Sequence, residues 1–571
     1  MKLHPPSSLI AGVLALFALA ACGGGDDPPP SQAAAPQPTP TEPAKPIAVD
    51  VLIQGGSVYN GDDIEPSVAD VGVVGDRIVF VGKTPEGSTA TRTIDAAGMA
   101  VTPGFIDAHT HADGDLLSAT ASKRLNLPFV TQGVTTAVIG NDGYGSYDIA
   151  GQAERMRVNP PGTNAAMFVG FGPVRQSQLA NNNVAPSAAQ LENMKKLVSS
   201  AMCQGAIGFS TGLYYTPQNF STTEEVIEVA KAAAVHGVPY DSHIRDEQTT
   251  TGLPAAIAEA LRIGREAGMP VHIAHIKALG ADVKGTSGAL IKMIEDAQAA
   301  GQKVTADQYP WLASSTYLSA ALIPPWANAG GRTELLKRFD DPAVQDELRT
   351  DITENLRRRY GAEAILIASG NAKYVGKTLA DVAQASTGGD AVAATIMVLR
   401  ESDNLIANFN QSDEDVRAFM QRPWVMTSSD SSAGHPRAVG SFPQKYREYV
   451  VNQKVLSVGQ FVKSSTSLTA DSLGIVDRGR LTVGQFADIV VFDPARFKAK
   501  ATYTAPTALS EGIVLTMING QAVVEMDVPK NVAAGRALLR KPQASLCPAS
   551  PVSAKVAMSP ASAGAGHDHL H

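Results

Sequence analysis

The chain has 571 residues, of which 44% are hydrophobic and 18% are charged, and its formal net charge is −8. This length allows one large catalytic domain and a smaller one, and the composition is that of a globular protein. No basic face stands out, so nucleic acid is not expected as a partner.

The N-terminal segment, residues 1–21, reads as an export signal. A weakly basic start precedes an apolar core, Leu9 to Ala21, that is too short to anchor a chain across a bilayer. It runs into Ala21-Cys22 followed by glycines, which resembles a bacterial lipoprotein signal. The resemblance implies lipidation at Cys22, contact with the membrane through this anchor only, and a place in the cell envelope. Because Gly23 and not aspartate follows the cysteine, the pattern favours the outer membrane facing the periplasm. An ordinary cleaved signal peptide is the alternative.

Segments of low complexity flank the folded part. Residues 22–48 are rich in Pro and Ala, which predicts an unfolded tether. Residues 541–571 are again rich in Ala, Ser and Pro, and end in three alternating histidines. We expect a disordered tail there, with weak metal binding as the alternative. The two remaining cysteines, Cys203 and Cys547, do not indicate a disulfide framework, and Cys203 is expected to be a small core residue.

Short strands separated by glycine-rich turns lie at both ends of the folded part, in residues 49–102 and 476–540. We expect both segments to build one small β-sandwich, with the central domain inserted between them.

The centre, residues 103–475, alternates apolar strands with helical stretches, which is typical of a parallel α/β fold. Eight such repeats predict a (β/α)₈ barrel. The strand candidates are Gly104–Ala108, Thr136–Gly140, Ala166–Gly170, Ala206–Ser210, Pro239–Ser242, Val271–Ala274, Val304–Asp307 and Trp424–Thr427. A charged helical insertion is expected at residues 330–420; a lid, an oligomer contact and a plain solvated insertion all remain open.

Histidines and carboxylates follow several of these strands. His109 and His111 follow the first strand, His243 the fifth, His275 the sixth and Asp430 the eighth. Residues i and i+2 of a strand point to one side, so the first pair aims two imidazoles at one spot. Active sites of (β/α)₈ barrels lie at this end of the strands, and neutral imidazole suits zinc and its neighbours. The pattern predicts a metal-dependent hydrolase.

The chain resembles the amidohydrolase superfamily and, within it, the N-acyl-D-amino-acid deacylases. The resemblance covers roughly residues 49–530. It rests on Gly104-Phe105-Ile106-Asp107-Ala108-His109-Thr110-His111, Gly208-Phe209-Ser210-Thr211-Gly212-Leu213, Ser242-His243-Ile244-Arg245, His275-Ile276-Lys277-Ala278, Asp307-Gln308-Tyr309-Pro310, and Ser429-Asp430 followed by His435-Pro436-Arg437.

The resemblance implies that His243 and His275 hold one tight Zn²⁺, that His109 and His111 form a second, weaker position, and that Asp430 is the general base and acid. One departure concerns the turn after the second strand, Asn141-Asp142-Gly143, where the family usually has cysteine as a zinc ligand. Asp142 is the expected substitute ligand, or else a turn residue without metal contact. As a hard oxygen donor it would let other divalent metals compete with zinc.

The expected reaction is hydrolysis of N-acyl-D-amino acids to a carboxylate and a free D-amino acid. The resemblance and the position at strand ends make five residues candidates for binding the substrate, with a structural ion pair as the alternative for the charged ones: Lys277, Tyr309, Arg437, Arg245 and Tyr214. A cyclic amidase or imidase and a metal-dependent dipeptidase are the enzymatic alternatives, and a non-catalytic binding lipoprotein is the third. Neither the acyl group nor the oligomeric state is indicated.

Overall fold

The protein is described by a computed structural model that covers residues 45–547. The expected signal peptide, Cys22 with its expected lipid anchor, most of the expected tether and the three histidines near the C-terminus lie outside the described residues.

A parallel barrel forms the centre. Its strands are β6 (Phe105–Asp107), β7 (Val134–Ile139), β8 (Asn164–Gly170), β9 (Gly208–Gly212), β10 (Tyr240–His243), β11 (Val271–Ile273), β12 (Val304–Gln308) and β16 (Val425–Thr427). They pair in the order β16-β12-β11-β10-β9-β8-β7-β6, which confirms the predicted (β/α)₈ fold and all eight strand candidates. Bonds from Ala108 N–H to the Thr427 carbonyl (3.5 Å) and from Asp430 N–H to the His109 carbonyl (2.9 Å) bridge the first and last strands.

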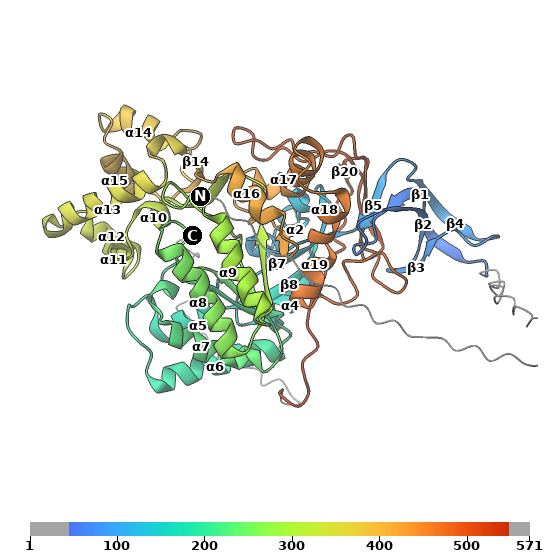
Figure 1. The fold of residues 1–571 in the computed structure, drawn as a ribbon, viewed down its shortest axis with the longest axis horizontal. Coiled ribbons are helices and arrows are strands. Elements are labelled where there is room, and N and C mark those ends of the chain that lie inside the picture. Colours follow the sequence, from blue (N-terminus) through green and yellow to red (C-terminus); the bar gives the residue numbers. More distant parts are fainter. Residues whose placement is uncertain (1–44, 548–571) are drawn as a thin grey trace, which may run out of the picture. The chain divides into compact units, whose positions relative to one another are not determined.

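Helices cover the outside of the barrel, because each carries one apolar face that the strands bury. The main ones are α4 (Ile149–Val158), α5 (Phe171–Leu179), α6 (Ala188–Cys203), α7 (Thr223–Ala234), α8 (Gly252–Ala267), α9 (Ser287–Ala299) and α16 (Asp413–Met420). Figure 1 shows α7, α8 and α9 side by side. After β16 come α17 (Arg437–Gln444), the π-helical segment η4 (Lys445–Asn452), α18 (Val458–Ser464) and α19 (Ser467–Leu473). Short helices α1 (Asp113–Leu116), α2 (Ala121–Arg124) and α3 (Leu127–Val130) follow β6.

The two ends of the folded chain share one β domain. Its strands are β1 (Ala48–Val58), β2 (Ser67–Val74), β3 (Arg77–Gly82), β4 (Thr89–Asp95), β5 (Ala100–Pro103), β17 (Ile489–Phe492), β18 (Ile513–Ile518), β19 (Gln521–Glu525) and β20 (Val528–Pro529). β5 pairs with both β1 and β17, so strands from the two ends form one continuous hydrogen-bonded sheet. Residues of both ends, among them Ile53, Val71, Ile489 and Leu515, bury one apolar cluster.

The insertion between β12 and β16 differs from the helical stretch expected at 330–420. It begins earlier and contains a three-stranded antiparallel sheet of β13 (Ala313–Tyr317), β14 (Ile365–Ser369) and β15 (Leu405–Phe409). Its helices are α10 (Leu318–Leu322), α11 (Pro325–Asn328), α12 (Arg332–Arg338), α13 (Gln345–Arg358), α14 (Leu379–Ser386) and α15 (Ala391–Glu401). The insertion has its own apolar core, which includes Leu348, Ile352 and Leu399.

The C-terminal part of the described chain corrects the expectation for the cysteines. Strand β21 (Ala537–Leu538) pairs with β8 and brings the following residues to the end of α6, where Cys547 forms a disulfide with Cys203. Residues 541–547 therefore belong to the folded part and not to a tail. Within residues 45–547 no single helix is long and apolar enough to cross a membrane; α14 and α15 meet the criterion only together, across a bend of 96°.

Candidate metal centre

The loops after the barrel strands bring the candidate ligands together by tying their backbones to one another. Asp107, at the end of β6, accepts bonds from the N–H groups of His109 (3.3 Å) and Ser429 (2.9 Å). The His111 N–H donates to the Ser431 hydroxyl at 3.1 Å. The loops after the first and last strands are thereby held in register.

The turn after β7 that carries Asp142 is held by Gln218, which lies in a short helical turn after β9. The buried Gln218 side chain donates to the Asp142 carbonyl (3.0 Å) and accepts from the Gly212 N–H (2.7 Å). Gly143 has φ +71°, and a Cβ there would lie 2.0 Å from the Gln218 amide oxygen, so only glycine fits. This packing leaves the Asp142 side chain pointing among the histidines.

Asp142 lies between four imidazoles. Its Oδ1 is 3.4 Å from His109 Nε2 and 3.4 Å from His275 Nε2. Its Oδ2 is 3.6 Å from His111 Nε2 and 3.6 Å from His243 Nδ1. Asp430 completes the cluster, with Oδ1 3.2 Å from His111 Nε2 and 3.9 Å from His109 Nε2. The structure thus brings together all six residues predicted as ligands or catalytic base.

Three of these six have strained backbones. Asp142, His275 and Asp430 have φ of +54°, +32° and +45°, in the region that side-chain-bearing residues seldom adopt. Such strain persists where the surrounding structure holds it, and it gathers at functional sites. The strained backbone conformations direct the side chains of Asp142, His275 and Asp430 toward one point, and they lower local stability.

Buried polar groups contact the ring nitrogens that face away from Asp142 and so orient the imidazoles. Lys277 Nζ lies 2.6 Å from His275 Nδ1 and 2.7 Å from Glu247 Oε1, which leaves Nε2 of that histidine to face Asp142. Asp307 accepts a bond from His272 Nε2 at 2.8 Å and lies 3.8 Å from His109 Nδ1. Partners of this kind fix the orientation of metal-binding histidines.

The electrostatics of the cluster favour added positive charge. Burial opposes ionisation of Asp142, yet the neighbouring histidines hold its pKa well below the usual range. Burial and Lys277 lower the pKa of His275, but Asp142 and Asp430 outweigh them and raise it to about 10. Burial would also raise the pKa of Asp307, whereas His272 and His109 bring it to about 2.

The residues fit a divalent metal by their chemistry. Nδ1 and Nε2 of His109 and Oδ1 of Asp142 are buried and make no hydrogen bond to any residue between 45 and 547. Three groups here each place their ligand atoms within 4.8 Å of one another: His109, His111 and Asp430; His109, Asp142 and His275; His243, Glu247 and His275. Imidazole and carboxylate are the donors of catalytic metal sites in hydrolases.

The predicted substrate-binding residues divide into two sets. Arg437 NH1 lies 2.8 Å from Asp430 Oδ2, and the Tyr309 ring packs beside Arg437 (4.8 Å) and Lys277 (5.8 Å). The Tyr214 ring lies 5.6 Å from His243, and its hydroxyl donates to the Ala320 carbonyl of the insertion. Arg245 points elsewhere: its guanidinium bonds to Glu259 and to the carbonyls of Asn219 and Ser221, so the structure does not bring it to the cluster.

Sequence reasoning missed Glu247, Gln218 and Asp307. Glu247 stands four residues after His243 in a loop, and only the fold shows that this loop returns to His275 and Lys277. Asp307 ends a predicted strand, and its position there was the available signal.

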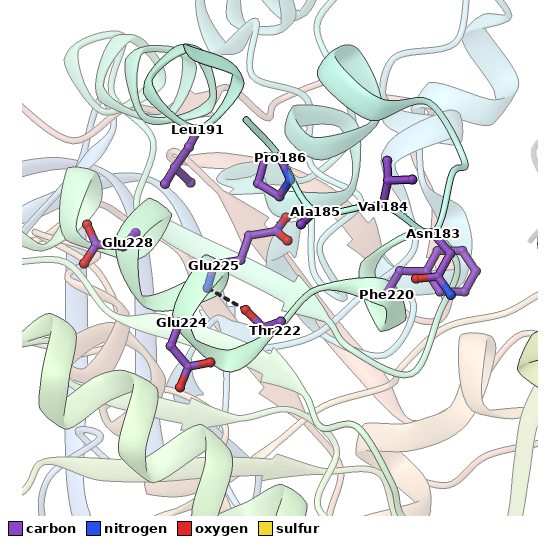
Figure 2. Close-up of a pocket in the computed structure, with 10 residues that line it drawn as sticks. All are labelled: Asn183, Val184, Ala185, Pro186, Leu191, Phe220, Thr222, Glu224, Glu225 and Glu228. Atoms are coloured by element: carbon purple, nitrogen blue, oxygen red, sulfur yellow. Dashed lines mark hydrogen bonds between the residues drawn. The ribbon is translucent and has the colours of Figure 1, made fainter. Parts of the chain in front are cut away.

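A separate pocket of about 400 Å³ lies between α6, α7 and the short helix η1 (Gln218–Phe220). Figure 2 shows Leu191, Phe220 and three glutamates around it. One of these, Glu225, is paired with the buried Arg175 at 2.9 Å. The lining contains none of the candidate ligands, so this pocket is distinct from the metal centre.

Comparison with known proteins gives the family. The sequence model of the amidohydrolase family matches residues 385–524. D-aminoacylase from Alcaligenes xylosoxydans xylosoxydans is 32% identical over 86% of this chain and 98% of its own length. A solved D-aminoacylase structure with a binuclear metal centre, described as showing one-metal activation and second-metal attenuation, has a TM-score of 0.74 and 31% identity, and covers 86% of this chain and 100% of its own. The solved N-acyl-D-glutamate deacylase from Bordetella bronchiseptica, complexed with zinc and a phosphonate mimic of the tetrahedral intermediate, has a TM-score of 0.74 and 29% identity. It also covers 86% of this chain and 100% of its own. The chain belongs to the D-aminoacylase family of amidohydrolases.

Proposed function

We propose that this protein is a metal-dependent amidohydrolase that cleaves the amide of N-acyl-D-amino acids, releasing a carboxylate and a free D-amino acid. The observation that carries the proposal is the cluster of four histidines and Asp142 at the ends of the barrel strands. Asp430, which is paired with Arg437, lies against this cluster. The relatives named D-aminoacylase and N-acyl-D-glutamate deacylase supply the substrate class.

The metal would be held by His109, His111, Asp142, His243 and His275. When bound, it supplies a Lewis acid that polarises the scissile carbonyl and lowers the pKa of water toward about 7. Zinc is the ion expected from the sequence, and the solved N-acyl-D-glutamate deacylase is reported with zinc.

Asp430 takes the proton from the attacking water and returns it to the departing amine. Burial alone would raise the pKa of this carboxyl, but the charge of Arg437 and the adjacent histidines keep it well below its usual range. Asp430 is therefore ionised before the reaction. Because Arg437 NH1 contacts Oδ2 while Oδ1 faces His111, one oxygen is anchored and the other is left toward the cluster.

We expect a cluster of cationic side chains to bind the free carboxylate of the substrate. Arg437, Lys277 and the Tyr309 ring lie together beside Asp430 and His275. Arginine offers a two-pronged contact to a carboxylate and lysine a point charge. Tyr214, next to His243 on the side facing the insertion, is placed to pack against the amide.

We further propose that the protein is exported and lipid-anchored at Cys22. The signal pattern of residues 1–21 is one support, and the Cys203–Cys547 disulfide is another, because disulfides persist in oxidising compartments such as the periplasm. Growth with a labelled fatty acid tests it: we expect label in the wild-type protein and none in Cys22→Ser.

The activity is tested by assaying N-acetyl-D- and N-acetyl-L-amino acids side by side with the metal-loaded protein. We expect release of amino acid from the D-series only. Turnover of cyclic imides or of dipeptides with no cleavage of either N-acetyl series would instead favour a cyclic amidase or a dipeptidase of the same superfamily.

A further inference from the structure

The hydroxyl of Tyr309 is engaged by a side chain that lies about a hundred residues further along the chain. Nε2 of Gln411 lies 2.9 Å from it and is the one hydrogen-bond partner found for this hydroxyl among residues 45–547. Gln411 lies in the short segment between β15 and α16, and its backbone N–H donates to the Leu312 carbonyl at 3.1 Å. The segment that leads back into the barrel is therefore tied to a candidate substrate-binding residue.

The orientation of the Gln411 amide is fixed by a second partner. The same Nε2 lies 3.2 Å from the backbone carbonyl oxygen of Trp311. Because a carbonyl can only accept a hydrogen bond, the amide must place its nitrogen, and not its oxygen, between Trp311 and Tyr309. An amide nitrogen can only donate, so the Tyr309 oxygen accepts this bond and its own O–H is left to donate elsewhere.

The phenol of Tyr309 keeps its proton. Burial raises its pKa, the charge of Arg437 opposes this and the charge of Asp430 adds to it, so that the pKa lies well above its usual range. The carboxylate of Asp430 acts through its charge and is not a hydrogen-bond partner of the hydroxyl. A protonated hydroxyl that already accepts one bond has a proton to offer to a further acceptor.

The neighbours of this hydroxyl are donors as well. The guanidinium carbon of Arg437 lies 4.8 Å from the centre of the Tyr309 ring, and Nζ of Lys277 lies 5.8 Å from it. The segment from Tyr309 to Trp311 is also tied to α17, because the Trp311 indole donates to the Ser441 hydroxyl (3.1 Å), which donates to the Arg437 carbonyl (2.8 Å). Donors held together in this way suit a group that only accepts.

We propose that Gln411 is a positioning residue for substrate recognition: by donating to the Tyr309 oxygen, it leaves the Tyr309 O–H to donate to the free α-carboxylate that Arg437 binds. A carboxylate fits this place because it offers acceptors only, whereas an ammonium group offers donors only. The inference rests on the proposed function for the identity of the substrate, but it is tested by binding and without turnover.

The probe is the phosphonamidate analogue of N-acetyl-D-alanine, in which a tetrahedral phosphorus stands in place of the scissile carbonyl carbon. It is used in two forms, as the free carboxylate and as the carboxamide, with the metal-loaded protein. Calorimetry gives a Kd for each form. The ratio of the carboxamide Kd to the carboxylate Kd is the carboxylate preference, and changes in metal affinity or overall folding affect both forms alike.

Three variants separate the roles of the two side chains. Tyr309→Phe removes the proton, Gln411→Met removes the amide donor at similar size, and Gln411→Glu replaces the donor by an acceptor to which the Tyr309 O–H would turn. Gln298→Met is the matched control. Gln298 is a half-buried glutamine of α9 whose Nε2 donates to the Val304 carbonyl at 2.8 Å, at the end of β12 away from Tyr309.

We expect the wild type and Gln298→Met to share one high carboxylate preference. Tyr309→Phe should lower it about 10-fold, and Gln411→Glu should lower it as much, since a hydrogen bond to a charged group is lost in both. Gln411→Met should lower it by only about threefold, because the O–H can still rotate toward the ligand. Gln411→Met added to Tyr309→Phe should change it by less than about twofold.

The double variant decides between positioning and a merely structural role. An equal fall on Gln411→Met in the presence and in the absence of the Tyr309 hydroxyl would overturn the proposal, and so would a wild type without carboxylate preference. A Gln411-dependent carboxylate preference in a protein that cleaves no N-acetyl-D-amino acid would support the inference and remove the proposed reaction.

Discussion

At the rim of the barrel, Asp142, His275 and Asp430 have left-handed backbones, and both ring nitrogens of His109 have no hydrogen-bond partner in the described part of the chain. The insertion from β13 to β15 is built in another way: it closes an apolar core of its own, begins α14 with a capping box at Thr378 and α15 with an Asp390 cap, and keeps its charged pairs near solvent. At the rim, strained backbones lower local stability but bring the candidate ligands together, whereas the insertion is stabilised by ordinary packing and capping. Substitutions at the rim should therefore change activity, and substitutions in the insertion should change stability.

The largest effect is expected at Asp430. Asp430→Asn removes the proton acceptor while keeping the shape of the side chain, so kcat/KM for an N-acetyl-D-amino acid should fall by about 10²–10⁴-fold. Metal content, measured on the same sample, separates lost proton transfer from a lost ligand. Retention of more than a tenth of the activity would show that another group accepts the proton.

Arg437→Ala should come next. It removes both the partner of Asp430 and the proposed contact to the substrate carboxylate, and charged hydrogen bonds of this kind contribute about 3 kcal/mol, or roughly 100-fold in kcat/KM. Substrates whose α-carboxylate is blocked as an amide separate the two roles. If the loss is the same for free and blocked substrates, Arg437 acts through Asp430 alone and does not bind the carboxylate.

A third prediction concerns Lys445, which lies below the rim at the join between β16 and α18. Its ammonium group is fully buried and donates to the hydroxyls of Thr427 (2.8 Å) and Ser464 (3.1 Å), and burial lowers its pKa from 10.5 to about 7. Between these values the unfolded chain binds a proton that the folded chain does not, so this residue makes stability rise with pH across that window.

Lys445→Met should remove that rise, which amounts to about 1.4 kcal/mol per pH unit between pH 7 and 10. Urea denaturation at several pH values gives the measurement, with Lys463→Met, an exposed lysine of α18, as the control. Parallel stability profiles for wild type and Lys445→Met would show that Lys445 stays charged in the folded protein.

The sequence predicted the rim better than the parts that surround it. Strand ends followed by His109, His243, His275 and Asp430 could be located because a parallel barrel places all such ends on one side. The Cys203–Cys547 disulfide could not, since 344 residues separate the two cysteines and only the pairing of β21 with β8 brings them together. Arg245 was misplaced because spacing along a loop does not show which way a side chain turns.

The insertion was misread for a similar reason. Strand β13 has the sequence Ala-Ser-Ser-Thr-Tyr, whose polar residues do not signal a strand, and it becomes one only by pairing with β15, about ninety residues further along the chain. Asp390, by contrast, is a helix cap that acts locally.

The smallest effect, expected at Asp390, completes the comparison. Its carboxylate accepts the N–H groups of Val392 and Ala393 at 3.0 Å each, and pairs with Arg349 at 2.7 Å near the surface. Asp390→Ala should lower the unfolding free energy by about 1 kcal/mol through loss of the cap. Asp390→Asn should lose only a few tenths of a kcal/mol, since asparagine also caps and exposed ion pairs contribute about 0–1 kcal/mol. Neither should alter kcat/KM. A change in kcat/KM with either variant would mean that destabilising the insertion also changes the geometry of the rim, so that the two regions are coupled.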